Sequence, residues 1–172
     1  SKAAAAKDKP GAESSPDAVA LYADAASFQN NGAFDLAVDE WAKFVEKFPK
    51  DPLAPKARHY LGVCHLQLKQ YDKAITAFAA VAKDFPKFEL LEDTTYNLAL
   101  SQFLQAATPP NPAGYATAAA SFASHRGQFP KSKHADQAWF YEGESRYHQG
   151  QKAEAVAAYA EVVKRDRKST RL

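Results

Sequence analysis

The sequence is poor in cysteine and glycine and contains no long apolar run. Its single cysteine, Cys64, excludes an intrachain disulfide. No stretch approaches the roughly 18 consecutive apolar residues that a membrane-spanning helix needs, so we predict no membrane span. Only 7 glycines stand beside an alanine-rich hydrophobic content of 46%, a balance that favours packed helices over turn-rich sheets. These absences predict an all-α protein.

A strong net charge is also missing. The 172 residues include 22 basic and 20 acidic side chains, which leave a formal net charge of +2. This balance excludes the positive field that is typical of nucleic-acid-binding domains. Only the segment from Lys164 to Arg171 is locally basic, and the dipole of a helix C-terminus favours cations there. We therefore expect no nucleic acid among the partners, and we assign 167–172 as a basic tail.

Catalytic and metal-binding signatures are absent too. The chain has no glycine-rich phosphate loop, no Gly-x-Ser-x-Gly elbow, and no His-x-x-x-His or Cys-x-x-Cys pair. Acidic residues such as Glu142 and Glu144 are explained by a solvated helix face. We predict that the protein is not an enzyme and uses no metal or cofactor.

An internal repeat is the strongest feature that the sequence does contain. Apolar residues recur at offsets of 3, 4, 7, 10 and 11 over residues 34–48 and again over 71–85, which is a helical pattern. Two further copies follow, and three of the four helices end in Phe-Pro-Lys, where proline stops the helix. The matching alanines lie 37, 44 and 37 residues apart, at Ala37, Ala74, Ala118 and Ala155.

Other helices lie between these stripes, so each repeat is predicted to be a helix hairpin. The longer interval has a visible cause, because the Pro- and Gly-rich segment 108–114 adds a loop inside the third hairpin. Such an array forms a right-handed all-α solenoid. The predicted repeat domain spans 17–166, with hairpins at about 17–49, 54–86, 89–130 and 134–166.

The first segment, 1–16, holds Ala, Lys, Pro and Ser without aromatic residues or periodicity. We predict a flexible linker here. Such a segment commonly follows a removed signal peptide or joins two domains.

The repeat register also assigns Cys64. His65 follows it directly, but adjacent helical residues point about 100° apart, so the two do not face one site. Serines occupy the matching place in the other hairpins, at Ser27, Ser101 and Ser145. Cys64 is therefore predicted to be a small packing residue and not a nucleophile.

The repeats resemble those of the tetratricopeptide repeat family. Residues of the second and fourth hairpins carry the resemblance: Leu61, Gly62, Tyr71, Ala74, Phe78 and Pro86, then Trp139, Gly143, Gly150, Ala155 and Tyr159. The small residues Gly62 and Gly143 are expected where the two helices of a hairpin approach closely. Two positions depart from the family pattern, because Glu142 replaces a leucine and Asp24-Ala25 replaces Leu-Gly.

Within this family the chain is similar to bacterial envelope members. Its repeats are longer than the roughly 34 residues that are usual, and elongated turns such as 48–57 look like those of outer-membrane assembly lipoproteins and of periplasmic Tol-Pal coordinators. The resemblance implies a protein-interaction scaffold in the bacterial periplasm or cell envelope. A cytoplasmic location is the alternative.

A binding trough is predicted on the concave side, which the first helices of the hairpins line. Its rows are aromatic and aliphatic and contain no Lys or Arg, so we do not expect a carboxylate clamp. An alternative is that the neighbouring hairpin, or the long loop over 109–114, covers some of Leu66, Phe103 and Leu104. The predicted partner-binding residues are Tyr22, His59, Tyr96, Leu100, Phe103, Phe140, Tyr147 and His148.

The last hairpin suggests a second mode of interaction. No polar capping helix is evident after about residue 166, so Ala155, Tyr159, Val162 and Val163 are expected to have an uncovered flank. This implies either a homo-oligomer through the C-terminal hairpin or a longer array. The alternatives to a partner-binding scaffold are thus a self-assembling structural repeat and the recruiting domain of a larger multidomain protein or enzyme.

Overall fold

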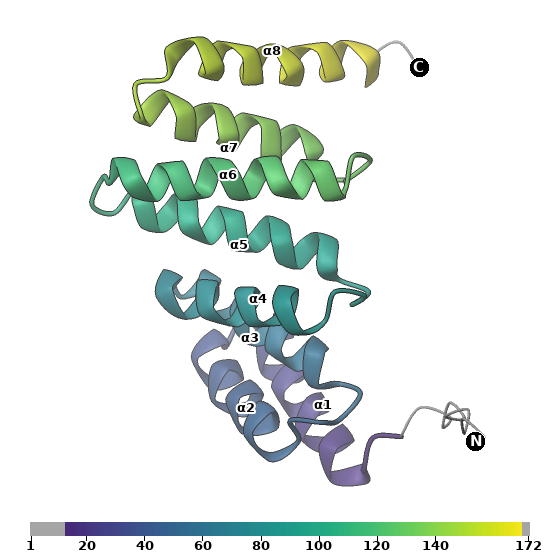
Figure 1. Cartoon of the computed structure of the whole chain (residues 1–172). Coiled ribbons are helices and arrows are strands. Elements are labelled where there is room, and N and C mark those ends of the chain that lie inside the picture. Colours follow the sequence, from purple (N-terminus) through teal and green to yellow (C-terminus); the bar gives the residue numbers. More distant parts are fainter. Residues whose placement is uncertain (1–12, 170–172) are drawn as a thin grey trace, which may run out of the picture.

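Eight α-helices follow one another in the computed structural model, which describes residues 13–169. Figure 1 shows them stacked in chain order, with α1 and α8 at opposite ends. Over the described residues no strand forms beyond an isolated bridge between Ala107 and Pro110, so the all-α helical-repeat prediction is confirmed. The helices are α1 Pro16–Asn30, α2 Phe34–Lys47, α3 Ala54–Gln67, α4 Tyr71–Asp84, α5 Leu91–Ala106, α6 Pro112–Gln128, α7 Ala135–His148 and α8 Lys152–Ser169.

The ends of the chain differ in part from the predicted linker and tail. Residues 1–12 of the linker and 170–172 of the tail lie outside the described residues. Helix α8 continues to Ser169, past its predicted end at 166. No helix within residues 13–169 is long and apolar enough to cross a membrane.

Local sequence signals set several helix ends. Ser15 caps α1 by accepting a hydrogen bond from the Ala18 backbone N–H at 3.2 Å, and Pro16 follows at the first helical position. The second helices α2, α4 and α6 end immediately before Phe48, Phe85 and Phe129. Each of these phenylalanines precedes a proline, which disfavours further helix, so the predicted stop signal is confirmed.

The turn inside a hairpin needs one residue in the left-handed region. Gly32 has φ 76° and Gly150 has φ 78°, while Lys69 takes the matching place in the second hairpin with φ 58°. Glycine adopts this conformation without a steric penalty. In the third hairpin a loop replaces this turn, and the Asn111 backbone N–H closes it by donating to the Ala106 carbonyl at 2.7 Å.

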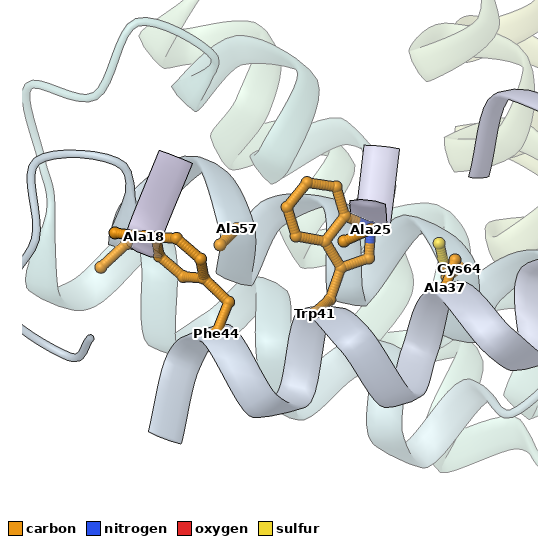
Figure 2. Packing of buried hydrophobic residues seen from close by; sticks show 8 residues of the cluster. Ala18, Ala25, Ala37, Trp41, Phe44, Ala57 and Cys64 are labelled. Carbon is orange, nitrogen blue, oxygen red and sulfur yellow. The ribbon is translucent and has the colours of Figure 1, made fainter. Parts of the chain in front are cut away.

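Each hairpin is held by a large ring from its second helix. Trp41, Phe78 and Phe122 are fully buried at matching positions of α2, α4 and α6. Figure 2 shows Trp41 and Phe44 of α2 directed toward small residues of α1 and α3, including Ala25 and Ala57. Such burial contributes roughly 1.5–3 kcal/mol per large side chain.

Small residues on the first helices make room for these rings. A Cβ added at Gly62 would lie 2.8 Å from the Phe78 ring, and one added at Gly143 would lie 2.6 Å from the Tyr159 ring. The predicted close approach at both glycines is confirmed.

Successive hairpins are joined by the first helix of each hairpin, which packs against the hairpin before it. The Tyr60 ring of α3 stacks on Trp41 with centroids 5.6 Å apart, and Tyr141 of α7 stacks on Phe122 at 5.7 Å. First helices also touch one another, α3 with α5 and α5 with α7, whereas the described second helices make no comparable contact among themselves. The stack is therefore tighter along the first helices, which lie on its inner side.

Replacing Gly62 by alanine is expected to lower the free energy of unfolding by about 1–2 kcal/mol, because overpacking against Phe78 outweighs the better helix propensity of alanine. Gly127→Ala is the matched control, since a Cβ there meets nothing within 4 Å; it should raise stability by up to about 1 kcal/mol. Urea unfolding followed by circular dichroism measures both. Equal effects of the two variants would contradict the close approach at Gly62.

Candidate functional site

Two of the predicted partner-binding residues lie inside the stack. His59 is 4% exposed and Tyr96 is 6% exposed. The His59 Nδ1 atom lies 2.8 Å from the Thr94 hydroxyl of the next hairpin, and the Tyr96 ring stacks on His134 with centroids 4.2 Å apart. The expectation that His59 and Tyr96 line an open trough is corrected, because in each case the following hairpin covers the side chain.

Two more of these residues are partly covered. Phe103 lies between two rings, 5.6 Å from the Tyr115 centroid and 5.0 Å from that of Tyr141. The alternative that a neighbouring hairpin covers Phe103 is thus confirmed. Leu100 packs half-buried against the same cluster.

The remaining predicted residues are accessible at different places. Phe140 and Tyr147 are exposed on α7. His148 is exposed as well, and one face of its ring stacks on Tyr115 with centroids 4.6 Å apart. Tyr22 lies half-buried at the other end of the stack, 4.8 Å from Trp41 in an edge-on contact. The eight predicted residues therefore do not form one continuous trough.

A hollow opens between α1 and α3, on the inner side of the stack. Its volume is about 230 Å³. We call this the inner hollow; it is lined by Tyr22, Ala26, Gln29, Asn30, Trp41 and Tyr60. The Trp41 Nε1–H donates to Gln29 Oε1 at 2.8 Å, so the indole is held in place. Burial raises the pKa of Tyr22, which keeps its hydroxyl protonated as a hydrogen-bond donor.

Sequence reasoning missed a second hollow, of about 450 Å³, between α2, α3 and α4. We call this the outer hollow; it is lined by Val45, Arg58, Leu61, His65, Asp72, Lys73, Thr76, Ala77 and Ala80. At the matching place near α7, the Arg126 guanidinium lies 3.2 Å from the Trp139 ring centroid and fills the gap. The signal in the sequence is weak, since it consists of small residues, Ala77 and Ala80, on the second helix.

Glu142 is buried, which corrects its assignment to a solvated face. The Arg126 Nε–H donates to Glu142 Oε2 at 3.1 Å, and Arg146 donates to Oε1 at 3.3 Å. Glu142 is buried because the preceding hairpin packs over this side of α7 and supplies Arg126. Glu144 differs, because it accepts a hydrogen bond from the Tyr159 hydroxyl at 2.5 Å.

A polar network also joins the third and fourth hairpins. Buried His125 reaches the Thr95 hydroxyl with Nδ1 at 2.8 Å and the Ser132 hydroxyl with Nε2 at 3.1 Å. Ser132 donates onward to Glu92 at 2.7 Å. Within residues 13–169, no group of three or more His, Cys, Asp or Glu side chains is arranged to hold a metal ion. The hydrogen bonds of the network therefore hold the helices that they join in position.

Cys64 is fully buried, as predicted for a packing residue. Its thiol donates to Gln29 Oε1 at 3.5 Å, and burial raises its pKa to about 11. The matching Ser101 and Ser145 are buried too, and each donates at 2.7 Å to the carbonyl four residues earlier. Ser27 is exposed because no described helix precedes α1.

Comparison with known proteins identifies the repeats. Tetratricopeptide repeat profiles match residues 22–87 and 137–169, together more than half of the chain. Among solved structures, MamA residues 41 to the end from Desulfovibrio magneticus RS-1 aligns over 88% of this chain and 76% of its own, with 17% identity and a TM-score of 0.72. A MamA RS-1 double mutant aligns over 89% and 77%, with 18% identity and a TM-score of 0.74. At these identities the likeness shows the fold alone, and no curated protein matches the sequence.

Acid is expected to destabilise the fold through His59 and His125. Burial lowers the pKa of each to about 4, below the value of about 6.5 in an unfolded chain. The unfolded chain therefore binds protons first as the pH falls. The stabilising contribution is complete above about pH 6.5 and is lost on the way to pH 4, on the order of a few kcal/mol for the two residues.

Urea unfolding at several pH values measures this loss. His59→Asn and His125→Asn should each flatten the pH dependence between 6.5 and 4. The Ser132 hydrogen bond holds the pKa of Glu92 below its usual range, so that carboxylate adds its own loss only below about pH 4.3. Stability that stays constant from pH 7 to 4.5 would contradict neutral burial of the two histidines.

The Cys64 thiol is expected to resist alkylating and disulfide reagents in the folded protein, because it is buried and its pKa is raised. Its reaction with a disulfide reagent at pH 8 should be at least ~100-fold slower than in denaturant. A cysteine introduced at exposed Asn30 is the internal comparison and should react at an ordinary rate. Equal reactivity of the two thiols would show that Cys64 is accessible.

Proposed function

We propose that this chain, which belongs to the tetratricopeptide repeat family, is a protein-interaction scaffold that holds a segment of a partner protein in the inner hollow. The observation that supports the proposal is the geometry of that hollow. It combines the half-buried rings of Tyr22 and Tyr60, behind which Trp41 is fully buried, with exposed Asn30 at its rim. Aromatic side chains beside polar groups that fix the orientation of a ligand are typical of specific recognition sites.

The size of the inner hollow favours a side chain over a metabolite. At about 230 Å³ it is smaller than the roughly 300–1,000 Å³ of small-molecule pockets. An aromatic or large aliphatic residue of a partner fits the edge-on ring environment around Tyr22 and Trp41. The protonated Tyr22 hydroxyl supplies a hydrogen-bond donor at the same place. We infer that the partner presents one large apolar residue beside a backbone or side-chain acceptor.

The predicted partner-binding set narrows accordingly. Tyr22 stays in the proposal, and Leu100 and His148 belong to the same inner side of the stack. His59 and Tyr96 leave it because they are buried between hairpins. Truncating Tyr96 would therefore test the stability of the stack and not the binding of a partner.

Location in the bacterial periplasm or cell envelope is a second part of the proposal. The elongated Phe-Pro turns support it through their similarity to envelope members of the family. Fractionation of cells that express the protein from its own gene tests it, and recovery with the cytoplasm would contradict it.

Site-specific crosslinking tests the inner hollow. A photoactivatable crosslinker on Asn30→Cys should capture a partner, while the same group on Thr76→Cys, at the outer hollow, should not. Native Cys64 does not interfere because it is buried. Adding Ala26→Lys to the Asn30→Cys protein should then reduce capture at least ~10-fold, because the lysine fills the hollow.

Circular dichroism checks that Ala26→Lys keeps the helical fold, and binding of the identified partner gives the affinity of each variant. Capture from Thr76 but not from Asn30 would transfer the binding site to the outer hollow. Equal capture in the presence and absence of Ala26→Lys would remove the inner hollow from the proposal.

A further inference from the structure

The α7–α8 end of the stack carries large apolar side chains in water. Phe140 and Tyr147 of α7 are 43% and 56% exposed, and Val156 and Val163 of α8 are 66% and 52% exposed. The Tyr159 ring, half-buried, lies next to Phe140 with centroids 6.2 Å apart. We call these five residues the end surface.

The repeat register identifies this surface with the interface between hairpins. Phe140 matches Tyr96, and Val156 matches Ala119, and both of these counterparts are buried. Tyr159 matches Trp41 and Phe122, which the next first helix covers with a stacked tyrosine. The end surface thus repeats the surface that each inner hairpin uses to bind its successor. Over residues 13–169, nothing covers it.

The opposite end of the stack does not complement it. The outward face of α1 is small and polar, with Ala20, Ala23, Asp24 and Ser27 all exposed. Asp24 occupies the register place of Leu61, Leu98 and Glu142. Leu61 packs against the core cluster of the first hairpin, and Glu142 pairs with Arg126 of the third.

The interface between the third and fourth hairpins shows what an acidic residue at the register position of Asp24 requires. There Glu142 is matched by Arg126 across the interface. The counterpart of Arg126 on the end surface is Val163. Head-to-tail stacking of two copies would therefore bury the Asp24 carboxylate against valine without a cation, which is costly.

We propose that the end surface binds the same surface of a second copy, which gives a closed two-fold dimer. Such an isologous contact joins two apolar surfaces and leaves both polar α1 ends in water. Val156 and Val163 lie seven residues apart, two helical turns, so in an antiparallel α8 pair each Val156 meets Val163 of the other copy. Exposed Ala160 lies between them and lets the two helices approach closely.

Sedimentation equilibrium of the chain over a wide concentration range tests the dimer. The wild-type protein should show a reversible monomer–dimer equilibrium. Val156→Lys combined with Val163→Lys should weaken it on the order of 100-fold, because four valines of the dimer become charged. The matched control is Val19→Lys with Leu36→Lys, which changes two comparably exposed apolar residues near the α1 end and should leave the equilibrium unchanged.

A second variant keeps the apolar surface intact. Ala160→Cys should form an intermolecular disulfide on mild oxidation, whereas Ala23→Cys on the α1 face should not. A wild-type protein that stays monomeric throughout, assemblies that grow beyond the dimer, or a loss of association in the control pair would each overturn the proposal. Crosslinking from Asn30 is an independent readout, so failure of the dimer and failure of the inner hollow are distinguishable.

Discussion

One contact, a large ring of the second helix against a small residue of the first, supports the whole stack. Phe78 leaves no space for a Cβ at Gly62, and the same ring row reaches the next hairpin, where Tyr60 stacks on Trp41. Each ring therefore closes its own hairpin and provides the base for the following one. In a repeat protein with only nearest-neighbour contacts, stability is approximately the sum of these two terms.

The polar contacts between hairpins act on register more than on net stability. Buried polar groups gain little when paired and cost much when left unpaired. His59 reaches Thr94 across the boundary between the second and third hairpins, whereas His125 pairs with Thr95 inside the third hairpin and with Ser132 in the turn that leads to the fourth. If hairpins slid or changed places, these buried polar groups would lose their hydrogen-bond partners. The apolar rings therefore supply most of the stability, while the histidines and hydroxyls specify the order of the hairpins.

The fold was predictable because the signals that carry it are local: the alanine spacing of 37, 44 and 37 residues marks four hairpins, and Phe-Pro stops end the second helix in three of them. The surface was less predictable, and Tyr96 shows why. The first helix of a hairpin packs against the second helix of its own hairpin and against the second helix of the preceding hairpin. Helix α5 also contacts the following hairpin. Apolar residues therefore occur on most sides of such a helix. Periodicity marks Tyr96 as apolar-facing without showing whether a partner or His134 covers it. The prediction that Glu142 lies on a solvated face was wrong for the same reason, since its partner Arg126 lies on another repeat.

A register that repeats also makes the two ends of the stack unequal. Every interior boundary joins a large ring row to a helix with small residues such as Cys64 and Ser145. The α1 end presents the small side of that junction, made hydrophilic by Asp24, whereas the α8 end presents the ring side, with Tyr159 and Phe140. Exposure of the small, polar side to water costs little free energy. Exposure of the ring side costs more, because removing its apolar surface from water would lower the free energy. The direction of the stack thus determines at which end the apolar side of the junction is exposed, independently of any site on the inner side.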